Sequence, residues 1–159
     1  MNKIYLLTGG NLGDRLESLK IAAHYIENKI GKIIRSSRIY ETGAWGNTAQ
    51  PDFYNQVHLL TTGLPAEKIM ERILKIEETM GRVRTSKNAA RIIDIDILFF
   101  NDEVVDTHWL SIPHPEIPNR RFVLEPLNEI APNLVHPVLM KRMHELLSIC
   151  TDRLPVTAV

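Results

Sequence analysis

Two aspartates in one short segment, Asp94 and Asp96, are the residues of this 159-residue chain whose type and spacing best suit chemistry. They lie in its most strand-like run, residues 91–100, where isoleucines alternate with them. Residues two apart in a strand point to the same face, which places the two carboxylates about 7 Å apart on one side. Such carboxylates repel each other unless a positive charge lies over them. Arg91 is one candidate for that charge, and a divalent metal is another.

The segment just before the aspartates, residues 82–91, is basic and contains no acid. It has neither helical nor strand periodicity, so we expect a loop. Forked cations that bind phosphate, followed by carboxylates that hold Mg²⁺, are the parts that phosphoryl transfer requires. The alternatives are a solvated basic loop and an edge strand with a solvated acidic face. Because cations and acids adjoin, we favour a nucleotide-phosphate site. The four cations are Arg82, Arg84, Lys87 and Arg91.

Composition predicts one globular domain over residues 1–159, with a frayed tail from about residue 151. Hydrophobic residues make up 44% of the chain and charged residues 24%, which is ordinary for a globular protein. The formal net charge is zero, so we expect neither nucleic acid nor a membrane surface as a partner. The single Cys150 excludes an internal disulfide and fits a reducing cytoplasm. No apolar run reaches the roughly 18 residues that a membrane span needs.

Periodic apolar residues predict strands and helices that would position these groups. Asp14 is expected to cap the first helix, Pro65 to begin the second, and Gly31 and Gly81 to end them. The glycines of residues 9–14 are expected to form a turn. The predicted strands are residues 4–8, 32–42, 53–62 and 91–100, and the predicted helices are residues 14–30, 65–81 and 139–150.

Two further side chains have both a structural and a functional interpretation. Asn55 shares a strand face with Phe53 and Val57, and it either satisfies backbone groups or contacts a ligand. Trp45 lies in a long loop, where it offers apolar surface to a ligand or packs into the core. The sequence alone leaves both pairs of alternatives open.

Glu77 and His114 stand out by their positions. Glu77 is near the end of the second predicted helix, where the helix dipole disfavours a carboxylate. This hints at a cationic or hydrogen-bonding partner, although a surface glutamate is the simpler interpretation. His114 lies between two prolines, which restrict its pose as suits a ligand-contacting group.

In order, these segments resemble the 6-hydroxymethyl-7,8-dihydropterin pyrophosphokinase family of folate biosynthesis. The combination of Asp-x-Asp, Pro-His and Asn-Arg-x-Phe is specific, whereas no single motif would suffice. The chain departs from the family pattern at residues 88–90, Asn-Ala-Ala, where many members have Trp-Gly-Pro. The matching stretches are residues 9–15, 40–42, 50–55, 77–84, 91–98, 113–115 and 119–122.

The resemblance implies an α+β fold with a ferredoxin-like βαββαβ core, an antiparallel sheet packed with helices, and an extra C-terminal helical segment. It implies transfer of diphosphate from ATP to the hydroxymethyl group of 6-hydroxymethyl-7,8-dihydropterin, which leaves AMP. Two Mg²⁺ ions would be held by Asp94 and Asp96, and Arg82 and Arg91 would stabilise the transferring group. A cytoplasmic monomer is expected.

The resemblance also implies a set of substrate contacts. Phe53 and Phe122 would sandwich the flat pterin ring, and Asn55 would hydrogen-bond its amide edge. A non-catalytic ligand-binding module and a kinase for another planar alcohol remain as competing hypotheses. The implied ATP contacts are Glu77, Arg84, Arg91, Leu98, Ser111, His114 and Arg120. The implied pterin contacts are Thr42, Trp45, Phe53, Asn55 and Phe122.

Overall fold

The computed structural model describes residues 1–43, 49–83 and 90–159. The strands are β1 (Asn2–Gly10), β2 (Lys32–Ser36), β3 (Tyr40–Thr42), β4 (Phe53–Thr62), β5 (Asp94–Phe100), β6 (Val105–Asp106), β7 (Ser111–Ile112) and β8 (Val156–Ala158). The helices are α1 (Arg15–Lys29), α2 (Ala66–Thr79), α3 (Arg121–Ile130) and α4 (Met143–Ile149), with a short 3₁₀ turn at Ile117–Asn119.

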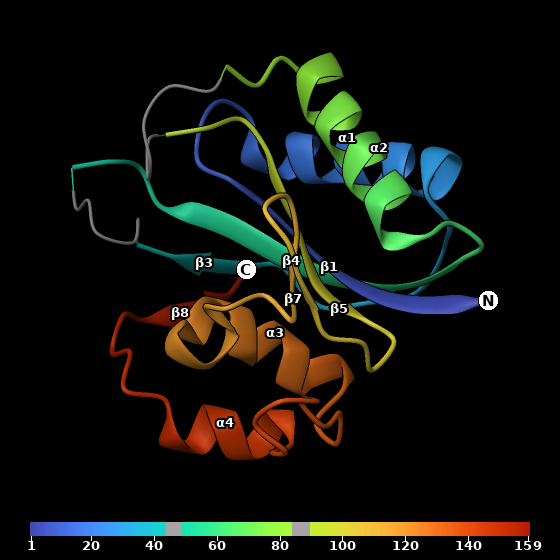
Figure 1. Cartoon of the computed structure of the whole chain (residues 1–159). Helices are drawn as coiled ribbons and strands as arrows, with labels where there is room; N and C mark the ends of the chain where they lie inside the picture. Colours follow the sequence, from blue (N-terminus) through green and yellow to red (C-terminus); the bar gives the residue numbers. More distant parts are fainter. Residues whose placement is uncertain (44–48, 84–89) are drawn as a thin grey trace.

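The main sheet has the order β5-β1-β4-β3-β8, and β2 also pairs with β4. Every pairing in it is antiparallel. With β2 and β3 counted as one interrupted strand, the order β1-α1-β2/β3-β4-α2-β5 is the predicted ferredoxin-like βαββαβ core, which is therefore confirmed. Helices α1 and α2 cover one face of the sheet, and α3 and α4 cover the other (Figure 1).

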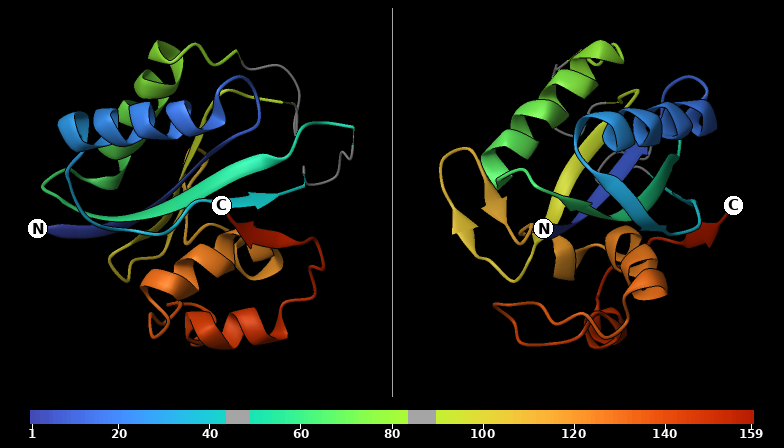
Figure 2. Two further views of the ribbon diagram at one scale, coloured as in Figure 1. Left: turned by 180° about the vertical axis from the view of Figure 1, so that it is seen from behind. Right: turned by 90° about the vertical axis from the view of Figure 1, so that its right-hand side faces the viewer.

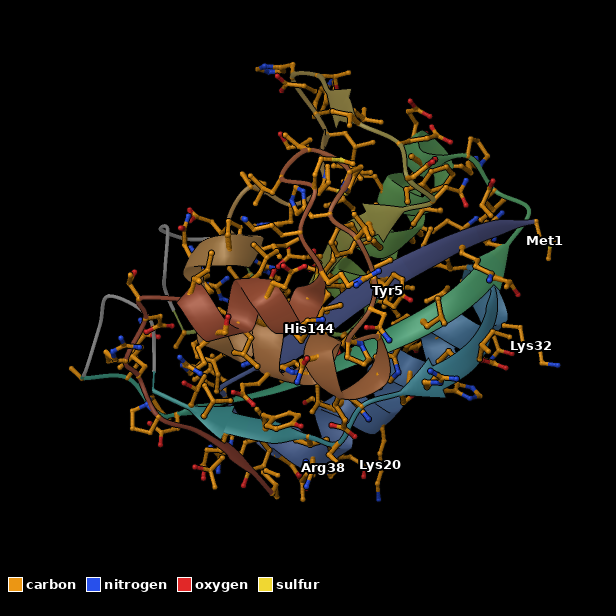
Figure 3. The ribbon with its side chains drawn as sticks, turned by 90° about the horizontal axis from the view of Figure 1, so that it is seen from below. Met1, Tyr5, Lys20, Lys32, Arg38 and His144 are labelled. Carbon is orange, nitrogen blue, oxygen red and sulfur yellow. The ribbon has the colours of Figure 1, made fainter. Side chains whose placement is uncertain are left out.

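Each face of the sheet has its own hydrophobic core, because the central strands are apolar on both sides. Ile4 and Leu6 of β1 belong to the core beneath α1 and α2, whereas Leu7 belongs to the core beneath α3 and α4. The two layers on either side of the sheet are visible in the rotated views (Figure 2). In Figure 3, His144 marks α4, which lies with α3 across the second face. No helix in the described ranges has the length and apolar character needed to cross a bilayer.

Both long helices form nearly as predicted. The Asp14 carboxylate accepts a hydrogen bond from the Glu17 amide at 3.1 Å, which caps α1. Pro65 is the N-cap of α2 rather than its first residue, and α2 is followed by Gly81 with a φ of +89°. The residues that signal helix starts and stops therefore predicted the ends of α1 and α2 to within about two residues.

The apolar face predicted for β5 needs a correction. Where β1 pairs with β5 the register shifts, and Leu98 opposes no residue of β1. Such a bulge moves every later side chain to the opposite face. Alternation over residues 91–100 predicts Phe99 on the face of Ile95 and Ile97. Phe99 instead packs in the core beneath α3 and α4, and Phe100 lies with Ile95 and Ile97. The strand also begins at Asp94, three residues later than expected.

The single strand expected over residues 32–42 is wrong, because it is interrupted between β2 and β3. The Ser37 amide donates to the Val57 carbonyl at 2.9 Å, and the Val57 amide donates to the Ser37 hydroxyl at 3.0 Å. A side-chain oxygen thus replaces a backbone acceptor in the ladder. The next amide, that of Arg38, donates to the carboxylate of Glu129 in α3 at 3.1 Å.

Two predictions for the C-terminal part are also wrong. The last helix begins at Met143 rather than residue 139, because Met140 has a φ of +54° and the His136 ring accepts the amides of Val138 and Leu139. The tail is not frayed, since β8 pairs with β3. Without β8, β3 would be an edge strand with unpaired backbone groups. Hydrogen bonds to these groups order the C-terminal tail.

A buried histidine in β4 predicts how stability depends on pH. Burial lowers the pKa of His58 to about 4, and the Ser36 hydroxyl lies 2.7 Å from its Nδ1. Between pH 6.5 and about 4, the unfolded chain binds a proton here that the folded protein excludes. The free energy of unfolding should therefore fall as the pH is lowered through this window, and His58 should account for about 2 kcal/mol of that loss at pH 5.

His58→Gln, which retains an acceptor for Ser36, should remove this part of the pH dependence. Urea unfolding of both proteins at pH 8 and pH 5 measures the difference. Equal losses of stability in the two proteins would contradict the assignment to His58.

Candidate active site

A cavity opens on the face of the sheet that carries α3, and residues from β1, β3, β4, β5 and the start of α3 line it. Ten residues proposed from the sequence lie in its wall, although they are spread over 81 positions of the chain from 42 to 122. They are Thr42, Phe53, Asn55, Arg91, Asp94, Asp96, Leu98, His114, Arg120 and Phe122. Leu7, Gly9, Gly43 and Val123 also line it and were not predicted.

Strand register brings these residues together. Gly9 of β1 pairs with Asn55 of β4 on one side and with Asp94 of β5 on the other. A Cβ on Gly9 would lie 2.1 Å from Asn55 Oδ1, so the absent side chain makes room for the asparagine. The turn predicted over residues 9–14 is wrong in its first two residues, because Gly9 and Gly10 still belong to β1.

Asp94 is balanced by two arginines. Its Oδ1 lies 2.7 Å from Arg82 Nη1, and its Oδ2 lies 3.3 Å from Arg91 Nη1. Asp96 forms no ion pair with any residue in the described ranges, and burial raises its pKa well above the usual value. The charge of Asp94, a side-chain hydrogen bond to Asp94 and the charge of Glu77 raise that pKa further, whereas the charge of Arg82 lowers it. The cavity therefore contains one buried carboxyl group that has no ion-pair partner in the described ranges.

The donor set at the two aspartates fits Mg²⁺. Within residues 1–43, 49–83 and 90–159, no group of three or more His, Cys, Asp or Glu side chains is arranged to hold a metal. Mg²⁺ is commonly held by only one or two carboxylates, with substrate phosphates and water completing its shell. Asp94 and Asp96 supply that number, and a bound cation would favour the charged form of Asp96, which burial disfavours.

Glu77 lies beneath this site rather than in the wall of the described cavity. The residue is only 2% exposed, and Oε2 accepts from Arg82 Nη1 at 2.9 Å and from the Ile95 amide at 2.8 Å. The partner expected from its place near the end of α2 is thus present. The carboxylate joins α2 to the free edge of β5 and holds the arginine that reaches Asp94.

Asn11 also positions the site, although the sequence reading missed it. It is 2% exposed, and its Oδ1 accepts the Arg91 amide at 2.8 Å. Its Nδ2 donates to the Pro51 carbonyl at 3.1 Å. Its signals in the sequence are a place beside two glycines and within the family-matching stretch 9–15, and its partners are 40 and 80 residues away.

His114 is held with one defined donor. Its Nδ1 accepts the Glu116 amide at 3.1 Å, so the neutral ring carries its proton on Nε2. Burial lowers the pKa of His114, as does the charge of Arg120. The ring is therefore neutral at pH 7 and able to donate through Nε2.

The part of the cavity lined by Phe53 and Phe122 suits a flat ring. Phe53 comes from β4 and Phe122 from α3, and each has a guanidinium nearby: Arg91 Cζ is 5.7 Å from the first ring centre and Arg120 Cζ is 5.8 Å from the second. Asn55 is 4% exposed, and its Nδ2 has no hydrogen-bond partner in the described ranges. Buried amides are normally paired. An unpaired donor in a cavity wall favours the ligand-contacting interpretation of Asn55.

Two of the predicted ATP contacts within the described ranges, Glu77 and Ser111, do not line this cavity. Ser111 is exposed on β7 and lines a neighbouring groove with His136 and Val138, which His114 also lines. Arg84 and Trp45 lie outside the described residues.

Comparison with known proteins gives consistent results. The model of the 7,8-dihydro-6-hydroxymethylpterin-pyrophosphokinase (HPPK) family matches residues 5–132. The chain is 39% identical over 145 residues to 2-amino-4-hydroxy-6-hydroxymethyldihydropteridine pyrophosphokinase of Aquifex aeolicus, covering 91% of this chain and 90% of that protein. It is 39% identical over 138 residues to the folic acid synthesis protein FOL1 of Dictyostelium discoideum, covering 87% of this chain but 21% of that protein.

Among solved structures, a Plasmodium falciparum HPPK-DHPS chain is similar with a TM-score of 0.76 at 22% identity. The similarity covers 93% of this chain and 43% of that one. The chain thus spans nearly the whole Aquifex protein but less than half of this longer chain. At this identity the structural similarity supports the fold.

Proposed function

The chain belongs to the 7,8-dihydro-6-hydroxymethylpterin-pyrophosphokinase family, and we propose that the cavity beside β5 is where it transfers diphosphate from ATP to the pterin. It is a pyrophosphokinase of folate biosynthesis that acts on hydroxymethyldihydropterin. The observation that carries the site assignment is the position of Arg91. Its guanidinium contacts Asp94 at 3.3 Å and lies 5.7 Å from the Phe53 ring centre, so it joins the acidic end of the cavity to the aromatic end.

At the acidic end, Asp94 and Asp96 would hold two Mg²⁺ ions. When bound, Mg²⁺ offsets the charge of the phosphates and makes the substrate hydroxyl more acidic. Arg82 and Arg91 already lie against Asp94, where their guanidinium groups can turn to the transferring diphosphate. His114 Nε2 and Arg120 provide further donors for phosphate oxygens from the same wall. Arg84, Leu98 and Ser111 complete the proposed nucleotide contacts.

At the aromatic end, Phe53 and Phe122 would stack on the pterin, and Asn55 would donate its unpaired Nδ2–H to the ring's carbonyl edge. Thr42 and Trp45 complete the proposed contacts. In this proposal the hydroxymethyl group of the bound ring would point toward Asp94 and Arg91. Proximity of the hydroxyl to the phosphates would then supply much of the rate enhancement.

Finer features of the enzyme belong to the same proposal. The whole chain, residues 1–159, acts as one pyrophosphokinase domain, and it works as a monomer in the cytoplasm. The buried free Cys150 fits a reducing compartment. The zero net charge fits small anionic substrates held by local cations rather than by a global field.

The direct test of the proposed function is product analysis. Purified protein should form AMP from ATP and Mg²⁺ only when 6-hydroxymethyl-7,8-dihydropterin is present. Formation of ADP, or no AMP, would contradict the proposal. A panel of other planar alcohols, assayed in the same way, distinguishes the pterin from related substrates.

Glu77→Gln separates a positioning role from contact with the nucleotide. Glutamine can still accept the Ile95 amide, but it loses the charge that holds Arg82. We expect kcat to fall by about tenfold with the KM for ATP unchanged, because a misplaced arginine weakens only the transition state. Steady-state AMP formation measures both constants.

The exposed neighbour Glu78 provides the matched control, since Glu78→Gln changes the same group without touching Arg82. A raised KM for ATP with unchanged kcat in Glu77→Gln would instead support direct contact with ATP, as the family resemblance implies.

A further inference from the structure

Helix α3 begins with a cap from a distant part of the chain. Its N-cap residue, Arg120, makes no side-chain capping bond within the described ranges, and its first turn contains no acid. The first amides of a helix need acceptors from outside it. The amide of Arg121 donates to Asp152 Oδ2 at 3.0 Å, across 31 residues. A carboxylate from the C-terminal segment therefore supplies the cap that α3 lacks locally.

Asp152 is itself tightly held. Its side chain is 8% exposed, and its Oδ1 accepts the Leu154 amide at 3.0 Å. Its carbonyl accepts the Arg121 Nε–H at 3.1 Å. A carboxylate at this end of a helix is also stabilised by the helix dipole. The cap is thus fixed on both sides, by α3 and by its own segment.

The residues after Asp152 hold a second element. Strand β8 pairs along the whole of β3, with Thr42 opposite Val156. The Thr42 hydroxyl donates to the Pro155 carbonyl at 3.0 Å, and the Val159 amide donates to the Ile39 carbonyl at 2.8 Å. In Figure 1, β8 lies beside β3 and above α3 and α4, so the segment runs from the start of α3 to the sheet edge.

Both of the elements joined in this way contribute residues to the cavity wall. Arg120 and Phe122 lie at the start of α3, and Thr42 lies at the end of β3. We propose that residues 151–159, the C-terminal strap, set the width of this cavity, and that Asp152 is a positioning residue for Arg120 and Phe122. The inference rests on the proposed function of the cavity. The strap lies beyond residues 5–132, which the family model matches.

A specific kinetic signature follows. Without its cap, the start of α3 frays, and only a fraction of molecules hold Arg120 and Phe122 in place. Apparent affinity falls by that fraction for every ligand that needs these residues. Bound ATP and pterin hold the wall in position themselves, so the turnover of the saturated enzyme is preserved.

The test uses Asp152→Ala in the full chain, with Asp102→Ala in an exposed turn as the matched control. For Asp152→Ala, the KM values for pterin and ATP should both rise about tenfold, with kcat within about twofold. A variant that only lost folded protein would show a lower maximal rate at unchanged KM, and that result overturns the proposal.

A second variant that ends at Pro155 keeps Asp152 and lacks β8. Its KM for pterin should rise, because β3 loses its edge partner. Amide hydrogen exchange gives a readout that does not depend on catalysis: the first turn of α3 should exchange faster in Asp152→Ala than in Asp102→Ala.

The outcomes separate the two proposals. An unchanged rate of amide exchange in the first turn of α3, or unchanged KM values in both variants, would contradict the role proposed for the C-terminal strap. Failure of the unmodified protein to form AMP would overturn the proposed function instead, and the exchange measurement would still decide whether Asp152 caps α3.

Discussion

Asp96→Asn is expected to lower kcat by at least about a thousandfold, because the carboxylate that would hold Mg²⁺ is worth several kcal/mol of charge stabilisation in the transition state. Asparagine preserves the shape of the side chain and offers only a neutral oxygen. No residue in the described ranges forms an ion pair with Asp96, and a bound cation would favour its charged form. Steady-state AMP formation at saturating Mg²⁺ measures the loss. Near-normal turnover would remove Asp96 from the proposed metal site.

The same substitution should stabilise the metal-free protein by about 1 kcal/mol. Burial raises the pKa of Asp96, so folding leaves its charge poorly solvated, and asparagine removes that cost. Chemical unfolding without Mg²⁺ tests this gain. Mg²⁺ should raise the stability of the unmodified protein and leave that of the variant unchanged. The exposed Asp102→Asn control should show neither a loss of activity nor a gain in stability.

Arg91→Ala is expected to have the second largest effect, a loss of roughly a thousandfold in kcat/KM, because it affects both ends of the cavity. The guanidinium contacts Asp94 at 3.3 Å, where the diphosphate is transferred, and it lies 5.7 Å from the centre of the Phe53 ring. Its removal should lower kcat and also weaken pterin binding, since the cation no longer supports the aromatic wall.

Arg91→Lys is the informative comparison, because it restores the charge but not the planar fork. It should recover pterin affinity more fully than kcat. Arg72→Ala, in α2 on the far side of the sheet, provides a control for the loss of one arginine. If Arg91→Ala changed only the KM for pterin, Arg91 would be a ring-binding residue without a role in diphosphate transfer.

Much of the site was predictable because its signals are local. The period of two placed Asp94 and Asp96 on one face of β5, and both aspartates line the cavity. Helix caps and glycine stops placed α1 and α2 nearly to the residue. The family resemblance added the aromatic residues Phe53 and Phe122, which periodicity could not have assigned to a ligand.

The errors lie where the outcome depends on distant partners. The bulge at Leu98 arises from pairing with β1 and reverses the faces of Phe99 and Phe100. The interruption at Ser37 depends on Val57, which lies 20 residues away. Neither change leaves a trace in the apolar pattern of the strand itself.

The sequence alone determined the chemical groups of this protein and their order, since periodicity, capping and composition act over a few neighbouring residues. Only the tertiary structure decided which of these groups have ion-pair or hydrogen-bond partners. It buried Glu77 against Arg82 and Ile95, buried Asp96 beside Asp94 without an ion pair in the described ranges, and brought Asp152 to the start of α3. Burial and hydrogen bonding depend on residues that meet through the fold, and the pKa of a carboxylate follows from them.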